Sequence, residues 1–324
     1  MKKGRNLRSV NTDGGVNLQF KLLSAIGIII IVSGHCYHGG MELAYNWFPP
    51  YSYNLALFVF ISGYFYKTDY EENIGKYIWK RTKRLLIPAY LWNIFYGGMV
   101  AFLGLFGFTI GAKPDLYNLF VMPFVDGEAF QYNLGSWFVY PLFLVCIINV
   151  LFRKFLKLIH LDNEFIVLIV YLTIGMIGIN TALENPTAIN GIVKLLVRTM
   201  FFLPCYEFGR FYKAVLEKKD TLNNVAYFAI IFAVQLILLT FCKDLEYTPS
   251  SFTKFNNGFI IPYISSITAI AFWLRVSRLF VPAIGNSKLV RLIADNTYGI
   301  MLNQLVGFMC LKFVFCGLSL ITSF

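Results

Sequence analysis

Long apolar runs, separated by short polar segments, occupy most of the chain. A helix needs about 20 apolar residues to cross the hydrocarbon core of a bilayer, and nine runs approach that length. They lie at Leu18–Cys36, Tyr51–Tyr66, Leu86–Phe108, Ser136–Phe152, Phe165–Leu183, Ile192–Tyr212, Val225–Cys242, Phe259–Leu274 and Tyr298–Gly317. The pattern therefore predicts an all-α fold, a polytopic bundle of transmembrane helices.

A further apolar segment is too short to span a membrane. Leu116–Val125 has ten residues and contains Pro123, so we expect a re-entrant or interfacial piece. The sequence shows neither an internal repeat nor an appended polar domain. We therefore expect a polar N-terminal segment at residues 1–17 and a single transmembrane domain at residues 18–324.

Composition and charge agree with this assignment. Hydrophobic residues make up 57 % of the 324 residues and charged residues only 14 %, which excludes an ordinary soluble domain. If the N-terminus is cytoplasmic, most Lys and Arg fall in cytoplasmic segments, while the opposite loops hold only Lys113, Lys243 and Lys254. This positive-inside distribution predicts a cytoplasmic N-terminus. It also accounts for the net charge of +11, so no nucleic-acid partner is expected.

The six cysteines and the N-terminal segment exclude other classes of site. The cysteines form neither a CxxC pair nor a cluster with histidine, so we expect no metal site and no disulfide. The N-terminal segment is basic and polar for too long before the first apolar run to resemble a cleaved signal peptide. The first run is therefore expected to be a retained span.

Histidines provide the first candidates for chemistry. His35 and His38 stand at the end of the first predicted span, and His160 lies in a basic loop. An imidazole near neutrality can take a proton from a hydroxyl and return it to a leaving group, so His35 is a candidate general base. The alternative is an interfacial histidine that bonds only water or backbone, and this alternative weighs more for His38, which two glycines follow.

Lys21 and Ser24 share a predicted helix face with His35. At 100° per residue they lie about 21 Å and 16.5 Å below it. This layout suits a phosphate-bearing donor that is held from the cytoplasmic side and reacts with an acceptor presented from outside. For Lys21 the alternative is a lysine that reaches the membrane interface at the start of a span.

Two pairs of charged residues lie near predicted cytoplasmic helix ends. Arg81 and Arg84 open the third span, where guanidinium groups can bind phosphate bidentately or simply follow the positive-inside rule. Glu207 and Arg210 stand three residues apart near the end of the sixth span. Their spacing predicts a local ion pair.

Polar residues near the opposite helix ends are candidates for acceptor binding. Asn133 and Trp137 stand at the fourth span, where a Trp serves as an interface belt residue or stacks on a sugar. Arg198 lies in the half of the sixth span that the charge rule disfavours, so we expect it to face a polar cavity or a partner. Asp295 and Asn296 predict a helix cap before the last span, which carries Asn303.

A series of motifs, each weak alone, occurs in a fixed order along the chain. They are FKLLSAIGIIIIVSGH at 20–35, FVFISGYFY at 58–66, RTKRLLIPAY at 81–90, SWFVYPLF at 136–143, FFLPCYEFGRFY at 201–212 and ADNTYGIMLNQ at 294–304. The ordered set resembles acyltransferase family 3, integral membrane enzymes that transfer acyl groups to extracytoplasmic sugars. By this resemblance His35 matches the catalytic histidine, and Arg81 and Arg84 match the basic helix start that meets the phosphates of the donor.

The chain departs from the family pattern at three points. The family has an acidic residue and then an Arg where this chain has Lys21 and Ser24, and a His where it has Asn303, which cannot exchange protons at neutral pH. Family members typically have ten spans, so the resemblance implies a bundle of nine to ten.

Residues and resemblance together predict an O-acyltransferase in the cytoplasmic membrane of a bacterium. The donor would be an acyl-coenzyme A, with an acetyl or succinyl group. The acceptor would be a cell-surface glycan or a lipid-linked saccharide, and membrane lipids would be the other partner. The predicted roles are general base for His35, donor binding for Lys21, Ser24, Arg81 and Arg84, and acceptor binding for His38, Asn133, Trp137, Arg198 and Asn303.

Two other functions are compatible with the sequence. In a glycan or small-solute transporter, Arg198, Glu207 and polar residues of the sixth and ninth spans would line a pathway, although transporters of this size commonly show internal repeats. A non-catalytic family member is the other alternative, because Ser24 and Asn303 replace reactive groups.

Overall fold

The structure, a computed structural model, describes residues 12–13, 16–36, 46–108, 113–242, 244–247, 249–250 and 255–322. Apart from loops and two short antiparallel strands, β1 (Thr12–Asp13) and β2 (Val16–Asn17), this part of the chain is helical. The predicted all-α fold is confirmed.

Each of the nine apolar runs contains a helix. In chain order these are α1 (Leu18–Cys36), α3 (Asn54–Tyr64), α5 (Ile87–Leu105), α7 (Val139–Leu158), α8 (Glu164–Glu184), α9 (Gly191–Phe211), α10 (Asn224–Phe241), α11 (Ile261–Ile284) and α13 (Thr297–Thr322). The connecting helical segments are η1 (Pro50–Ser52), η2 (Thr68–Glu71), α4 (Ile74–Arg81), η3 (Thr82–Leu86), η4 (Tyr117–Val121), α6 (Met122–Val125), η5 (Gln131–Phe138), η6 (Pro186–Ala188), η7 (Tyr212–Leu216) and α12 (Lys288–Asp295).

Six helical stretches of the described chain are long and apolar enough to cross a membrane. They are Leu18–His35, Ile74–Leu105, Gln131–Leu158, Glu164–Glu184, Asn224–Phe241 and Ile261–Ile284. Helix α3 is apolar but shorter. Helix α9 carries four charged residues, Lys194, Arg198, Glu207 and Arg210. The count of nine to ten spans and the cytoplasmic N-terminus stay predictions.

Several predicted helix boundaries are wrong, and the largest differences are in the third and eighth helices. The third helix begins at Ile74 rather than Leu86, because α4, η3 and α5 run on as one stretch; basic residues favour helices. The wider π-turn of η3, with Ile87 N–H bonded to Thr82 O, precedes Pro88, which has no N–H to donate. The eighth helix continues past Leu274 to Ile284.

Glycines allow α3 and α9 to pack closely against each other. At Gly63 of α3, a Cβ would lie 1.8 Å from the backbone oxygen of Tyr206 on α9. At Gly209 of α9, it would lie 1.9 Å from the backbone oxygen of Phe60 on α3. Small residues let helix backbones approach in membrane proteins. The motifs FISGY and CYEFGRFY therefore meet each other and hold α3 against α9.

Buried charges form a network between α7, α8 and α9. Arg153 bonds both carboxylate oxygens of Glu207 at 2.7–2.8 Å and one oxygen of Glu164 at 2.7 Å. Arg210 bonds Glu164 at 2.9 Å. The predicted local pair between Glu207 and Arg210 is wrong, because each side chain reaches a different neighbouring helix.

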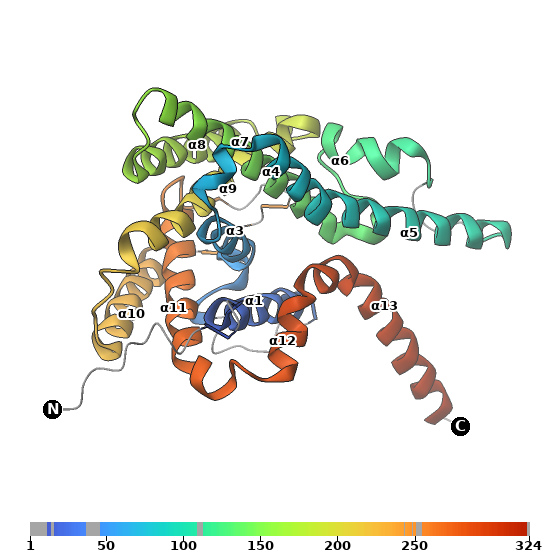
Figure 1. The fold of residues 1–324 in the computed structure, drawn as a ribbon. Coiled ribbons are helices and arrows are strands. Elements are labelled where there is room, and N and C mark those ends of the chain that lie inside the picture. Colours follow the sequence, from blue (N-terminus) through green and yellow to red (C-terminus); the bar gives the residue numbers. More distant parts are fainter. Residues whose placement is uncertain are drawn as a thin grey trace.

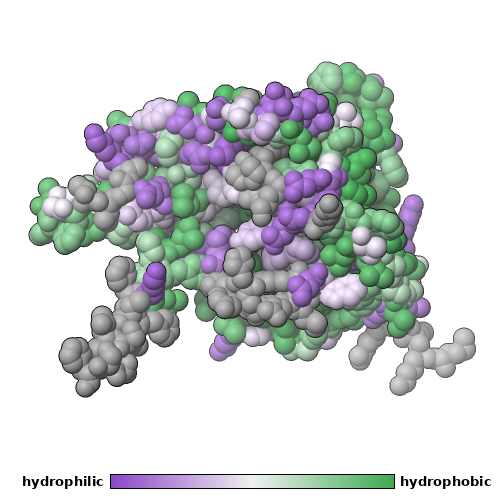
Figure 2. Space-filling model, turned by 180° about the vertical axis from the view of Figure 1, so that it is seen from behind, coloured by the Kyte–Doolittle hydropathy of each residue, from purple (hydrophilic) through white to green (hydrophobic). Residues whose placement is uncertain are grey.

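Helix α1 lies at the centre of the molecule. It contacts α3, α11, α12 and α13, and Figure 1 shows it crossing the middle of the bundle, with α5 and α13 extending from the same side. Apolar side chains cover much of the surface in Figure 2, next to bands of hydrophilic residues. Leu105, Val225 and Phe241 are more than four-fifths exposed, which is the surface expected of a protein in contact with lipid.

Candidate active site

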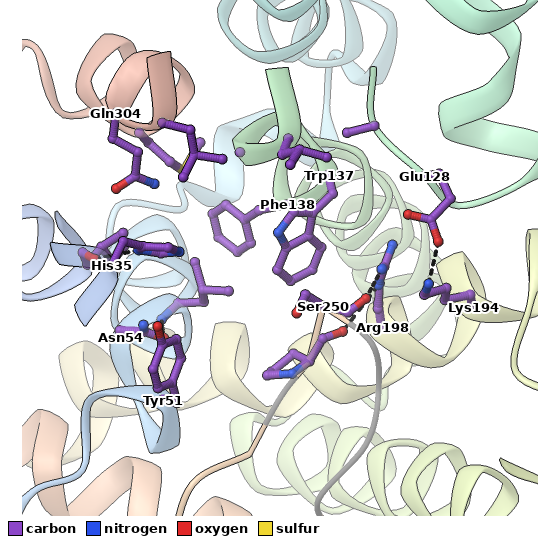
Figure 3. Close-up of a pocket in the computed structure, with 18 residues that line it drawn as sticks. His35, Tyr51, Asn54, Glu128, Trp137, Phe138, Lys194, Arg198, Ser250 and Gln304 are labelled. Carbon is purple, nitrogen blue, oxygen red and sulfur yellow. Dashed lines mark hydrogen bonds and ion pairs between the residues drawn. The ribbon is translucent and has the colours of Figure 1, made fainter. Parts of the chain in front are cut away.

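A cavity of about 460 Å³ lies at the His35 end of α1 (Figure 3). Its walls come from α1, η1, α3, η5, α9 and α13, and from the segments around residues 128 and 249–250. Ligand pockets in proteins commonly measure about 300–1,000 Å³. The cavity therefore has room for a small saccharide unit.

His35 lies on one wall of this cavity. Its Nδ1 is 2.7 Å from the backbone oxygen of Ile31. Because a carbonyl oxygen only accepts hydrogen bonds, we assign the proton of the neutral ring to Nδ1, which leaves a lone pair on Nε2. Tyr51 stands edge-on to the ring, 6.2 Å between centroids, and donates a hydrogen bond to Gly34 O at 3.0 Å. The imidazole is thus oriented as a proton acceptor.

Arg198 and Trp137 form the opposite side of the cavity. The guanidinium carbon of Arg198 lies 4.6 Å from the ring centre of Trp137. The guanidinium donates to the backbone oxygens of Gly127, Pro249 and Ser250, with Nε 3.2 Å from the Pro249 oxygen. Figure 3 shows the Trp137 indole between His35 and Arg198. Arg198 therefore lines a cavity.

An ion pair stands beside Arg198. Lys194 of α9 pairs with Glu128, and both residues line the cavity. Glu207 does not reach this cavity, because it lies in the ionic network with Arg153. The pathway expected of a transporter, with Arg198 and Glu207 along one wall, is therefore not formed by these side chains.

Helix α13 contributes Gln304 rather than Asn303. Gln304 lines the cavity, and its buried Oε1 lacks a hydrogen-bond partner among the residues that the structure describes. Asn303 instead accepts a hydrogen bond from Tyr96 of α5 and donates one to Gly299 O at 2.8 Å. Neighbouring helix residues point about 100° apart, and the sequence alone did not show which of the two faces inward.

Asn133 is also turned away from the cavity. It is fully buried, and its Nδ2 donates to Asn93 Oδ1 at 2.7 Å and to Ala89 O at 3.2 Å. These bonds tie η5 to α5. In the structure Asn133 supports the wall that carries Trp137, four residues further along η5.

A second, smaller cavity of about 200 Å³ lies further along α1. Ser24 and Ile28 line it, as do Leu85 and Tyr298. Ser24, Ile28, Ile31 and His35 follow one another at helical spacing, so the two cavities occupy the same face of α1. Phe138 and Met301 line both cavities and form the partition between them.

The other predicted donor-binding residues lie outside both cavities. Lys21 pairs with Asp295. Of the predicted capping pair, Asp295 is the last residue of α12 and only Asn296 directly precedes α13. Arg81 donates from Nε to Tyr77 Oη at 3.0 Å. Arg84 lies exposed on η3, directly before Leu85 of the second cavity. His38 lies outside the described residues.

Comparison with known protein families decides what class of protein carries this site. A family model described as an acyltransferase domain, Acyl_transf_3, matches residues 17–321. The chain belongs to this acyltransferase family. No curated protein and no solved structure matches it. The described part of the chain has six helical stretches long and apolar enough to cross a membrane. Together with membership of acyltransferase family 3, they indicate a multi-pass membrane protein and a transferase of acyl groups.

Proposed function

We propose that this family member is an O-acyltransferase that uses acyl-coenzyme A on one side of the membrane and a saccharide hydroxyl on the other. The main support is the geometry of His35. Its Nδ1–H is held by the Ile31 carbonyl, and its ring stands in a cavity of saccharide size. Membership of the acyltransferase family supplies the class of reaction.

In the proposed reaction, Nε2 of His35 takes the proton of an acceptor hydroxyl. The hydroxyl oxygen attacks the thioester carbonyl, a carbon–oxygen bond forms, and the carbon–sulfur bond breaks. The imidazolium then returns the proton to the departing thiolate. The hydrogen bond to Ile31 O keeps Nδ1 protonated throughout, so Nε2 alone carries the transferred proton.

The donor would approach along the Ser24 side of α1. In this proposal the pantetheine arm occupies the second cavity, and the thioester reaches His35 past Phe138 and Met301, which line both cavities. Arg81, Arg84 and Lys21 would bind the phosphates, because charged phosphates need cationic hydrogen-bond donors. The transferred group would be an acetyl or succinyl group.

Thiol release from acetyl-coenzyme A in detergent tests the proposal. The test variant is His35→Gln, and the matched control is His160→Gln, because His160 is exposed at the end of α7. Loss of a general base lowers a rate by about 10²- to 10⁴-fold, so we expect saccharide-dependent thiol release to fall that far in His35→Gln and to persist in His160→Gln. An unchanged rate in folded His35→Gln protein would remove the proposal.

A further inference from the structure

The charges of the described residues that line the cavity do not balance. Among them, Lys194 and Arg198 are cationic and Glu128 is the single carboxylate. The Nδ1–H form of His35 is neutral. Glu128 pairs with Lys194. Arg198 has no carboxylate within ion-pair distance among the described residues. Within the described part of the cavity wall, one positive charge is therefore uncompensated.

The unpaired positive charge of Arg198 is energetically unfavourable because the side chain is buried. Only 2 % of its surface is exposed, and an isolated buried charge is strongly unfavourable. Three backbone oxygens accept from it, whereas a guanidinium has five N–H donors. Carbonyl dipoles satisfy hydrogen bonds but add no negative charge. An anion in the cavity would accept hydrogen bonds from the remaining guanidinium N–H groups and would also balance the positive charge.

Of the two cations, Lys194 has a carboxylate partner and Arg198 has none among the described residues. Lys194 and Glu128 are partly exposed, at 16 % and 51 %, and neutralise each other at the cavity wall. Arg198 is deeper and stacks on Trp137 at 4.6 Å. Cations over an indole face are stabilised by the ring, which fixes the guanidinium in place without neutralising it.

We propose that the acceptor is anionic, with a carboxylate or phosphate that pairs with Arg198 while its reacting hydroxyl lies at His35. This inference rests on the proposed function. Figure 3 shows Trp137 between the two residues, so the sugar ring of such an acceptor would lie along the indole. The anion takes no part in the bond changes and positions the acceptor only.

The experiment distinguishes two possible sources of the anion. A carboxylate would belong to the sugar ring itself, as in a uronic acid. A phosphate would belong to the reducing end, where a saccharide is joined to a carrier lipid. Glucuronic acid and glucose 1-phosphate represent these two arms, and glucose is the neutral probe.

The measured quantity is the ratio of kcat/KM for each anionic probe to kcat/KM for glucose, with acetyl-coenzyme A as the donor. We expect a ratio well above one for at least one arm in the natural protein. Hydrogen bonds between charged groups are strong enough that Arg198→Gln should lower this ratio about 10- to 100-fold. Glu128→Gln should raise the ratio, because it leaves Lys194 unpaired beside the same cavity.

Arg198→Gln and Glu128→Gln are expected to change the kcat/KM ratio in opposite directions, so the test does not depend on one variant. If Arg198→Gln fails to fold because segment 249–250 loses its contacts, Glu128→Gln and Arg198→Lys still report the ratio. A ratio of one or less in the natural protein, or a ratio that neither charge change moves, would overturn the inference.

A binding measurement separates this inference from the proposed function. Binding of each probe is monitored by tryptophan fluorescence in the absence of the acyl donor. Glucuronic acid or glucose 1-phosphate that binds through Arg198 without any thiol release would refute the acyltransferase reaction and keep the anion site. Thiol release with equal efficiency for all three probes would keep the reaction and refute the anion site.

Discussion

The buried pair between Arg153 and Glu207 makes the sharpest prediction about stability. Both side chains are fully buried, and Glu207 has no other ion-pair partner among the described residues. Arg153→Met therefore leaves a carboxylate buried in the bundle. Breaking a buried pair in this way costs about 3–5 kcal/mol, and we expect the free energy of unfolding in mixed SDS micelles to fall by that amount.

The double variant Arg153→Met with Glu207→Leu should recover most of the loss. It removes both charges, and apolar replacement of a buried pair is often neutral; Glu164 keeps Arg210 at 2.9 Å. Arg278→Met is the control, with an expected cost of at most about 1 kcal/mol, because Asp220 retains Arg275 at 2.5 Å. A double variant as unstable as the two single variants combined would refute the reasoning.

Three further predictions concern single positions. Gly63→Ala places a methyl group 1.8 Å from a backbone oxygen of α9 and should lower the unfolding free energy by about 1–3 kcal/mol in the same assay. The control Gly98→Ala should be tolerated, because a Cβ at Gly98 would meet open space. Gln304→Ala should raise the KM for the saccharide, because Gln304 lines the cavity, whereas Asn303→Ala should leave KM unchanged and lower stability; the reverse pattern would show that α13 is turned the other way. Burial raises the pKa of the Glu71 carboxyl, so the folded state binds its proton more tightly and stability falls as pH rises above the ordinary glutamate range. Glu71→Gln should flatten this slope above about pH 4, and an equal slope in both proteins would contradict the assignment.

The helices were predictable because their signal is local. Each apolar run contains a helix, and α1 has the predicted bounds, Leu18–Cys36. The start of the third helix was missed because residues 74–86 contain five Lys and Arg residues. Such a basic segment beside an apolar run was interpreted as a loop. The chain continues the helix through them because no residue there breaks it, and the π-turn before Pro88 accommodates the proline.

The site was predictable only where helix spacing sufficed. His35 and Ser24 share a face of α1 because eleven residues make about three turns, and their two cavities lie along that face. The partner of Glu207 depends on how α7 packs against α9, and the direction of Asn303 depends on how α13 is rotated against α5. Both are properties of packing between distant segments, which one sequence without its fold does not contain.

Acyl transfer across a sealed membrane tests the central claim most directly. The protein is reconstituted into vesicles, with labelled acetyl-coenzyme A outside and the saccharide enclosed in the lumen. The account predicts labelled acetyl-saccharide in the lumen with the natural protein and none with His35→Gln. Product that forms only when both substrates share one side of the membrane, or forms equally with His35→Gln, would contradict it.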